Sequence, residues 1–126
     1  MEHTSELELE IEAATEADVF REALSAFNEL VANGAGHRPA RQHVQVMGED
    51  RGALLVAWLG ELTFLAETQA FIAQRVEALG LDDHRLSASV RGYIGEPRHL
   101  VKAVTLHRLL FERQDSRWRA RVVLDV

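Results

Sequence analysis

Two acidic side chains near opposite ends of the chain have the residue type needed to hold a metal ion. The sequence closes on RARVVLDV, in which Asp125 stands one position before the last residue. Near the start, residues 6–12 read ELELEIE, so Glu6 begins a run in which every second residue is acidic. Hard divalent cations prefer carboxylate oxygens as ligands. Glu6 and Asp125 are therefore candidate metal ligands if the fold brings them together.

Both runs alternate with the two-residue period of a strand. The first has glutamates on its polar face, and the corresponding face of residues 117–125 carries Arg117, Arg119 and Arg121, then Val123 and Asp125. Opposite charges on neighbouring strands stabilise a pairing, which predicts that the two strands lie side by side and antiparallel. The expected neighbours are Glu12 and Glu10 with Arg119 and Arg121, and Glu6 with Asp125.

At the end of this ladder two carboxylates would meet. They repel each other unless one takes a proton or a cation lies between them. The terminal carboxylate of Val126 adds another oxygen, so one interpretation is that Glu6, Asp125 and Val126 form part of a site for a calcium-like divalent cation. A slip of one residue in the register would separate the acids, and the alternative is that both are solvated strand ends without a ligand.

The rest of the chain predicts an α+β fold, a mostly antiparallel sheet with two helices packed on one face. Thr15 is expected to cap the first helix, Asn33-Gly34 to end it and Asp50 to cap the second. Residues 34–42 read as a loop, and Gly60 inside the second helix suggests a close packing contact. Strands are expected at 6–12 and 43–47, in a hairpin turning at LGLDDH (79–84) and in another turning at RQDSR (113–117).

Composition limits the classes of protein that the chain can represent. Its 126 residues are enough for one domain, taken as 1–126, and 47% apolar with 27% charged residues is ordinary for a folded chain. A net charge of −6 gives no overall attraction to nucleic acid, so no stable nucleic-acid binding is expected. A cytoplasmic location is predicted for three reasons: the sequence has no cysteine, no apolar run long enough to cross a membrane, and no leader pattern.

Five stretches in a fixed order resemble the archease family. The strongest is the C-terminal pair, a VKAVTLH strand followed by a hairpin that ends in WRARVVLDV. The matching segments are HTSELELEI (3–11), LLVAWLGELTFL (54–65), GEP (95–97), VKAVTLH (101–107) and WRARVVLDV (118–126). Three departures from the family pattern stand beside them: Glu6 in place of an Asp, a short RHL segment at 98–100, and Ala57 and Gly60 where acidic and Asn residues are common.

The resemblance implies a function. Archeases assist the GTP-dependent RNA ligase of tRNA splicing and RNA repair, which joins a 3′-phosphate or 2′,3′-cyclic phosphate end to a 5′-hydroxyl. They promote guanylylation of the ligase's active-site histidine and permit multiple turnovers. By resemblance, this chain is a cofactor of that ligase and not an enzyme, with Glu6, Asp125 and Val126 binding the metal.

Four further residues are candidates for contacts with the partner or with the metal ligands. His107 has apolar neighbours on its own strand face, where a partly buried histidine is the ordinary explanation. Lys102 is ordinarily an exposed strand lysine, although a cation there can pair with Asp125 or meet a phosphate. His3 is close in sequence to Glu6, and Glu61 reads as a solvated helix residue or as a partner contact.

Two other functions stay open. One is a chaperone-like adaptor that binds RNA-modifying enzymes without using metal, and the other is a metal-dependent hydrolase that uses Glu6 and Asp125. The sequence has no nucleophile elbow, phosphate loop or paired-histidine metal motif, which disfavours catalysis. Residues 118–121, WRAR, could stack on RNA and pair with it, but cross-strand pairing with the glutamates explains these arginines better.

Overall fold

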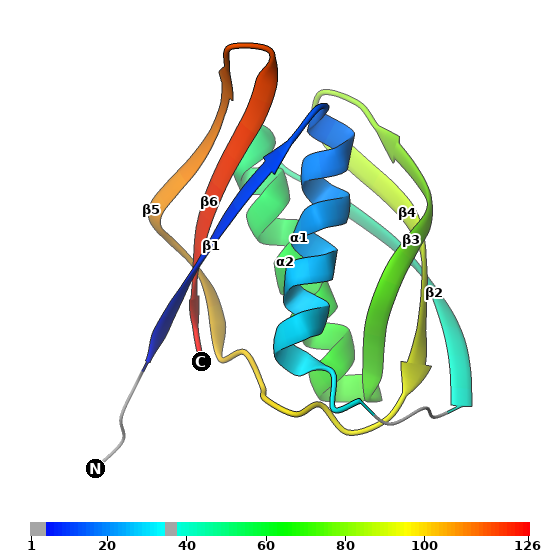
Figure 1. Cartoon of the computed structure of the whole chain (residues 1–126). Coiled ribbons are helices and arrows are strands. Elements are labelled where there is room, and N and C mark those ends of the chain that lie inside the picture. The colour runs from blue at the N-terminus through cyan, green and yellow to red at the C-terminus, as the bar shows by residue number, and fades with distance from the viewer. Residues whose placement is uncertain (1–4, 35–37) are drawn as a thin grey trace.

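The computed structural model describes residues 5–34 and 38–126, which form two helices and six strands (Figure 1). The elements in chain order are β1 (Glu6–Ala13), α1 (Glu16–Val31), β2 (Arg38–Met47), α2 (Arg51–Gln69), β3 (Phe71–Leu81), β4 (Arg85–Ile94), β5 (Ala103–Gln114) and β6 (Arg117–Asp125). Both predicted hairpins are present, β3 with β4 and β5 with β6. None of the helices in the described ranges is long and apolar enough to cross a membrane.

All strand pairs are antiparallel, and the strands form two sheets of three. We call the sheet with strand order β1-β6-β5 sheet A and the sheet with order β2-β4-β3 sheet B. The two helices lie between these sheets, with sheet A on the left and sheet B on the right (Figure 1). The α+β class is confirmed, but the strands form two sheets with the helices between them, where the sequence predicted one sheet with the helices packed on one face.

The helices need two sheets because their apolar surface is wider than one sheet can cover. Each helix buries more than one row of side chains. The buried positions are Val19, Phe20, Ala23, Leu24, Phe27 and Val31 of α1 and Leu54, Leu55, Trp58, Leu59, Leu62, Leu65 and Ala66 of α2. Together with the inner faces of both sheets they form one continuous core. In its centre Trp58 donates its indole N–H to the carbonyl of Phe20 over 2.9 Å, which ties α2 to α1.

The predicted helix starts are confirmed. Thr15 accepts a hydrogen bond from the Asp18 N–H at 3.1 Å, and Asp50 accepts one from the Ala53 N–H at 2.8 Å. The predicted end of α1 at Asn33-Gly34 is two residues late, since α1 ends at Val31 and the backbone is already extended at residue 32.

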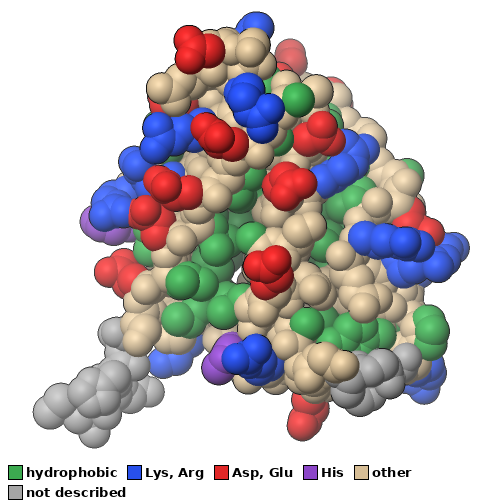
Figure 2. Space-filling model, viewed as in Figure 1, with side chains coloured by type: hydrophobic (Ala, Val, Ile, Leu, Met, Phe, Trp, Pro, Cys, Tyr) green, Lys and Arg blue, Asp and Glu red, His purple; other side chains and the backbone are tan. Residues whose placement is uncertain are grey.

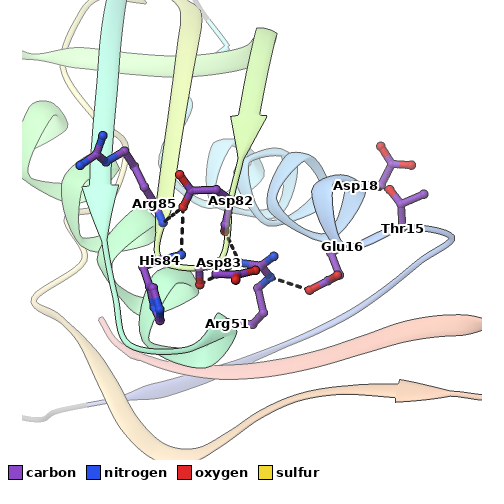
Figure 3. Close-up of polar contacts among 8 residues, drawn as sticks. All are labelled: Thr15, Glu16, Asp18, Arg51, Asp82, Asp83, His84 and Arg85. Atoms are coloured by element: carbon purple, nitrogen blue, oxygen red, sulfur yellow. Dashed lines mark hydrogen bonds and ion pairs between the residues drawn. The ribbon is translucent and has the colours of Figure 1, made fainter.

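Arg51 fastens three separate segments at one end of the molecule (Figure 3). Its guanidinium pairs with the Glu16 carboxylate at 2.5 Å and donates to the carbonyls of Asp82 at 2.6 Å and Asp83 at 3.3 Å. The first turns of α1 and α2 are thereby joined to the β3–β4 turn. In that turn the main-chain N–H groups of His84 and Arg85 both donate to the Asp82 carboxylate. These two hydrogen bonds, the one from His84 first, hold the pKa of the Asp82 carboxyl below its ordinary value.

Three details of the fold differ from the sequence interpretation or extend it. Residues 38–42, expected in a loop, belong to β2, where Pro39 is tolerated because β2 is an edge strand. The close contact expected at Gly60 is absent, since a Cβ built there meets nothing within 4 Å. Among the described glycines the closest approach is at Gly92, whose Cβ would lie 2.0 Å from the Ile72 carbonyl oxygen on the neighbouring strand.

Candidate functional site

The two acids singled out by the sequence lie directly opposite each other at one end of sheet A. Glu6 is paired with Asp125, and the rest of the β1–β6 ladder follows the predicted register. Beyond this pair the main chains of Ser5 and Val126 bond reciprocally, at 2.9 Å from the Val126 N–H and 3.4 Å from the Ser5 N–H. The predicted pairing is therefore confirmed, with Glu12 opposite Arg119, Glu10 opposite Arg121 and Glu6 opposite Asp125. We call Glu6, Asp125 and Val126 the acidic tip.

Lys102 reaches the acidic tip from the other side of β6. Its main-chain N–H donates to the Asp125 carbonyl at 2.7 Å, and the next residue, Ala103, is paired with Asp125 in the β5–β6 ladder. Because β6 is the central strand of sheet A, Asp125 has β1 on one side and β5 on the other. The exposed side chain of Lys102 therefore belongs to a residue that adjoins Asp125 at the end of sheet A.

Charge pairing along sheet A stops before the acidic tip. Arg119 pairs with Glu10 at 3.6 Å, and Arg108 pairs with Glu8. Within residues 5–34 and 38–126, neither Glu6 nor Asp125 forms an ion pair with Lys or Arg. The arginines thus neutralise acids in the middle of the sheet and leave two facing carboxylates uncompensated at its end.

The strand next to the tip contains a bulge that the sequence did not reveal. Pairing of β5 with β6 stops at Thr105 and resumes at Leu110, and Arg108 within the interruption has a φ of 56°. The Arg108 carbonyl accepts a hydrogen bond from the Arg121 guanidinium at 2.9 Å, which replaces a missing ladder bond. The alternation of residues 101–111 predicted an unbroken strand, because the pattern of apolar and polar residues does not show where a bulge lies.

The bulge changes the surroundings of His107. The expected partly buried position is wrong: His107 is exposed, because the bulge turns this segment out of the ladder. With Glu6, Glu8, Arg108 and Val123 it lines a hollow of about 110 Å³ beside the acidic tip. Leu106, the preceding residue, is 70% exposed, more than any other large apolar side chain of the described residues.

The acidic tip offers few ligands of its own for a cation. Two carboxylates and the main-chain oxygen of Val126 are hard donors of the kind that calcium prefers. Among the described residues no group of three or more His, Cys, Asp or Glu side chains lies close enough to hold a metal ion. Calcium takes six to eight oxygens, so a calcium ion held by these residues would need its remaining ligands from water or from a partner.

Comparison with known proteins agrees with the order of the motifs and with the fold. A model described as the Archease protein family matches residues 1–126. The chain belongs to the archease family. Curated archeases from Methanopyrus kandleri and Archaeoglobus fulgidus are 32% and 30% identical to it, and each alignment covers 100% of this chain and 96% of the relative.

Solved structures share the fold of this archease. The solution structure of Methanobacterium thermoautotrophicum protein 1598 superposes with a TM-score of 0.75 at 29% identity, covering 100% of this chain and 96% of that one. A crystal structure from Thermotoga maritima, described as an archease and possible chaperone, superposes with a TM-score of 0.72 over 100% of this chain and 94% of that one. At 20% identity, the second likeness concerns the fold alone.

The remaining candidate residues of this archease do not join the acidic tip. Glu61 lies on α2, and in the described part of the chain no hydrogen bond or ion pair links it to the tip. His3 lies outside the described residues. Of the four secondary candidates, the structure therefore brings Lys102 and His107 to the end of sheet A.

Proposed function

We propose that this archease is a non-enzymatic protein cofactor of the GTP-dependent RNA ligase that joins 3′-phosphate ends, and that it acts through its acidic tip. Membership of the archease family supports the partner. The observation that supports the tip is the register of β1 on β6, because it places the uncompensated carboxylates of Glu6 and Asp125 opposite each other at a free end of the sheet.

The open donor set of the tip favours a shared cation. Glu6, Asp125 and Val126 hold a divalent cation on one side, and the partner's groups or water complete its coordination. Such a cation supplies positive charge that can attract the phosphates of a nucleotide. Lys102 and His107, at the margin of the tip, are positioned to contact the same phosphates or the partner surface.

Multiple-turnover ligation tests this proposal. The cognate ligase, GTP, divalent metal and an RNA with a 3′-phosphate end are assayed with and without the chain, and with the variant Asp125→Asn. The matched control is Glu12→Gln, which makes the same charge change on the same face of sheet A but on β1, six positions from Glu6. We expect stimulation by the wild type and by Glu12→Gln, and its loss with Asp125→Asn.

Other outcomes separate the parts of the proposal. Equal stimulation by the wild type and Asp125→Asn would keep the ligase as partner and discard the acidic tip. No stimulation at all would reject the ligase as partner.

A chaperone-like adaptor is the second candidate function. The observation in its favour is that four large apolar side chains of the described residues are exposed and accessible to another protein. They are Met47, Phe64, Leu100 and Leu106, between 51% and 70% exposed. Suppression of light scattering by an aggregating RNA-modifying enzyme, unchanged by a chelator, would support this function. The same suppression abolished by the chelator would count against a metal-independent adaptor.

A further inference from the structure

The outer face of sheet B carries a concentration of positive charge that the proposed ligase cofactor role does not use. The strands β2, β3 and β4 contain five arginines and a single acid, Glu77, in a chain whose net charge is −6. Figure 2 shows a group of cationic side chains on the right of the molecule, over the region of sheet B. Charge of one sign is thus gathered on one sheet of an acidic protein.

Three of these arginines form a row across the sheet. In the ladder Arg91 of β4 is paired with Arg41 of β2 on one side and with Arg75 of β3 on the other. Like charges that face each other directly across strands destabilise a sheet, so the row is costly unless an anion compensates it. We call Arg41, Arg91 and Arg75 the arginine row.

One carboxylate compensates part of the row. Glu77, at a bulge in β3, pairs with Arg41 at 2.8 Å and with Arg91 at 3.3 Å. Among the described residues Arg75 forms no ion pair, and it is exposed. The row therefore retains excess positive charge, and the side chains of Arg41 and Arg91 are still 60% and 44% exposed.

The residues beside the row suit a polymer of phosphates better than a protein. Ser87 and Ser89 precede Arg91 on the same face of β4 and lie opposite Gly80 and Ala78 of β3. On the β3 side, the surface next to the row is therefore formed by small side chains. A protein partner is ordinarily held by a central apolar or aromatic cluster, which these positions do not offer. Interfaces with nucleic acid are more polar and positively charged, and the arginine fork matches phosphate oxygens.

The acidic side chains are concentrated elsewhere on the molecule. A hollow between β1 and α1 is lined by Glu10, Glu12, Glu22 and Glu29, and Figure 2 shows acidic side chains on both sides of a hollow on the front of the molecule. A polyanion is repelled from that surface and attracted to sheet B. The uneven distribution of charge would therefore orient the molecule on a polyanion.

We propose that the outer face of sheet B binds the phosphate backbone of single-stranded RNA through Arg41, Arg75 and Arg91. The choice of RNA over DNA rests on the proposed role beside an RNA ligase, while the binding itself follows from the arginine row. Binding is weak and independent of base sequence, because the row offers guanidinium groups and no aromatic platform. Glu77 limits the affinity, since it competes with phosphate for two of the three arginines.

Fluorescence anisotropy of a labelled oligouridylate with the isolated full chain tests the proposal without the ligase. Three phosphate contacts predict a slope of about −2 in a plot of log affinity against log salt, or roughly a 15-fold loss between about 50 and 200 mM salt. The double variant Arg75→Gln, Arg91→Gln should weaken binding at least about 10-fold at low salt and reduce the slope to about −0.7. Glu77→Gln should tighten binding several-fold.

The matched control is the double variant Arg113→Gln, Arg117→Gln, which removes two exposed arginines from the hairpin of sheet A. It should bind as the wild type does. No saturable binding at low salt, or an equal loss in the control, would overturn the proposal. Wild-type RNA binding by the Arg75, Arg91 variant together with loss of ligase stimulation would assign the row to an acidic protein surface instead. Because the ligase is absent from the RNA titration, its result does not depend on whether the proposed cofactor function holds.

Discussion

Replacing Asp125 by Asn should remove a calcium-dependent gain in stability while leaving the fold without metal almost unchanged. Directly opposed residues have Cβ atoms about 5 Å apart, and at the dielectric constant of water two carboxylates at that separation repel by less than about 1 kcal/mol. Without metal, relief of this repulsion makes Asp125→Asn slightly more stable or neutral. With metal, the wild type gains the free energy of binding, and the variant loses a charged ligand.

The size of the effect follows from linkage. At a free calcium concentration of about 100 times Kd, a ligand that binds only the folded state stabilises it by about 2.7 kcal/mol. A chain of 126 residues has an unfolding entropy of roughly 0.26 kcal/mol/K, so this gain raises Tm by about 10 °C. The asparagine variant, which keeps one carboxylate from Glu6, should shift by no more than a few degrees.

Thermal unfolding followed by circular dichroism measures both quantities. Each protein is scanned with a chelator and over a range of calcium concentrations, and Glu12→Gln serves as a control for loss of one negative charge on β1. The reasoning about the tip is refuted if Asp125→Asn keeps the full calcium-dependent rise. It is equally refuted if Glu12→Gln loses that rise.

Three more predictions concern the fold that positions these sites. Gly92→Ala should lower the free energy of unfolding by more than about 3 kcal/mol, because the new Cβ overlaps a carbonyl oxygen. Gly60→Ala should instead raise the free energy of unfolding by up to about 1 kcal/mol, since its Cβ enters open space on a helix. Urea denaturation of the two variants measures both changes. Arg51→Lys should lower the free energy of unfolding by about 1–2 kcal/mol in the same assay, because lysine lacks the guanidinium fork that joins three segments. A decrease of less than about 0.5 kcal/mol would contradict this role of Arg51. The Asp82 carboxyl has a lower pKa in the folded than in the unfolded state, so its contribution to stability is present above about pH 4 and is lost as the pH falls through the folded pKa. Asp82→Ala should therefore lower Tm at about pH 7. A Tm difference between variant and wild type that stayed constant down to about pH 2 would contradict this role of Asp82.

The β1–β6 pairing shows how far local patterns reach. Both strands alternate without interruption, and their polar faces carry opposite charges, so their partnership and register could be predicted from the letters alone. Helix starts were predictable for the same reason, since Thr15 and Asp50 each accept a hydrogen bond from an N–H three residues away. These features depend on short-range geometry that the period of the sequence encodes.

The features that were missed depend on contacts between distant segments. In the bulge of β5, Arg108 contacts two other strands, since its carbonyl accepts from Arg121 and its guanidinium pairs with Glu8. Nothing in the local sequence of residues 105–110 indicates those partners. The alternation around His107 predicted a partly buried side chain, whereas His107 is exposed.

The sequence by itself determined the strands and helices, their caps, the opposed charges of β1 and β6, and the motifs that mark the archease family. Tertiary structure alone decided that the strands divide into two sheets around the helices and that His107 is exposed. It also decided that Arg41, Arg91 and Arg75 form a row on sheet B. The physical reason is that periodicity fixes which face of an element is apolar, whereas the neighbour that covers this face is chosen by packing of the whole core.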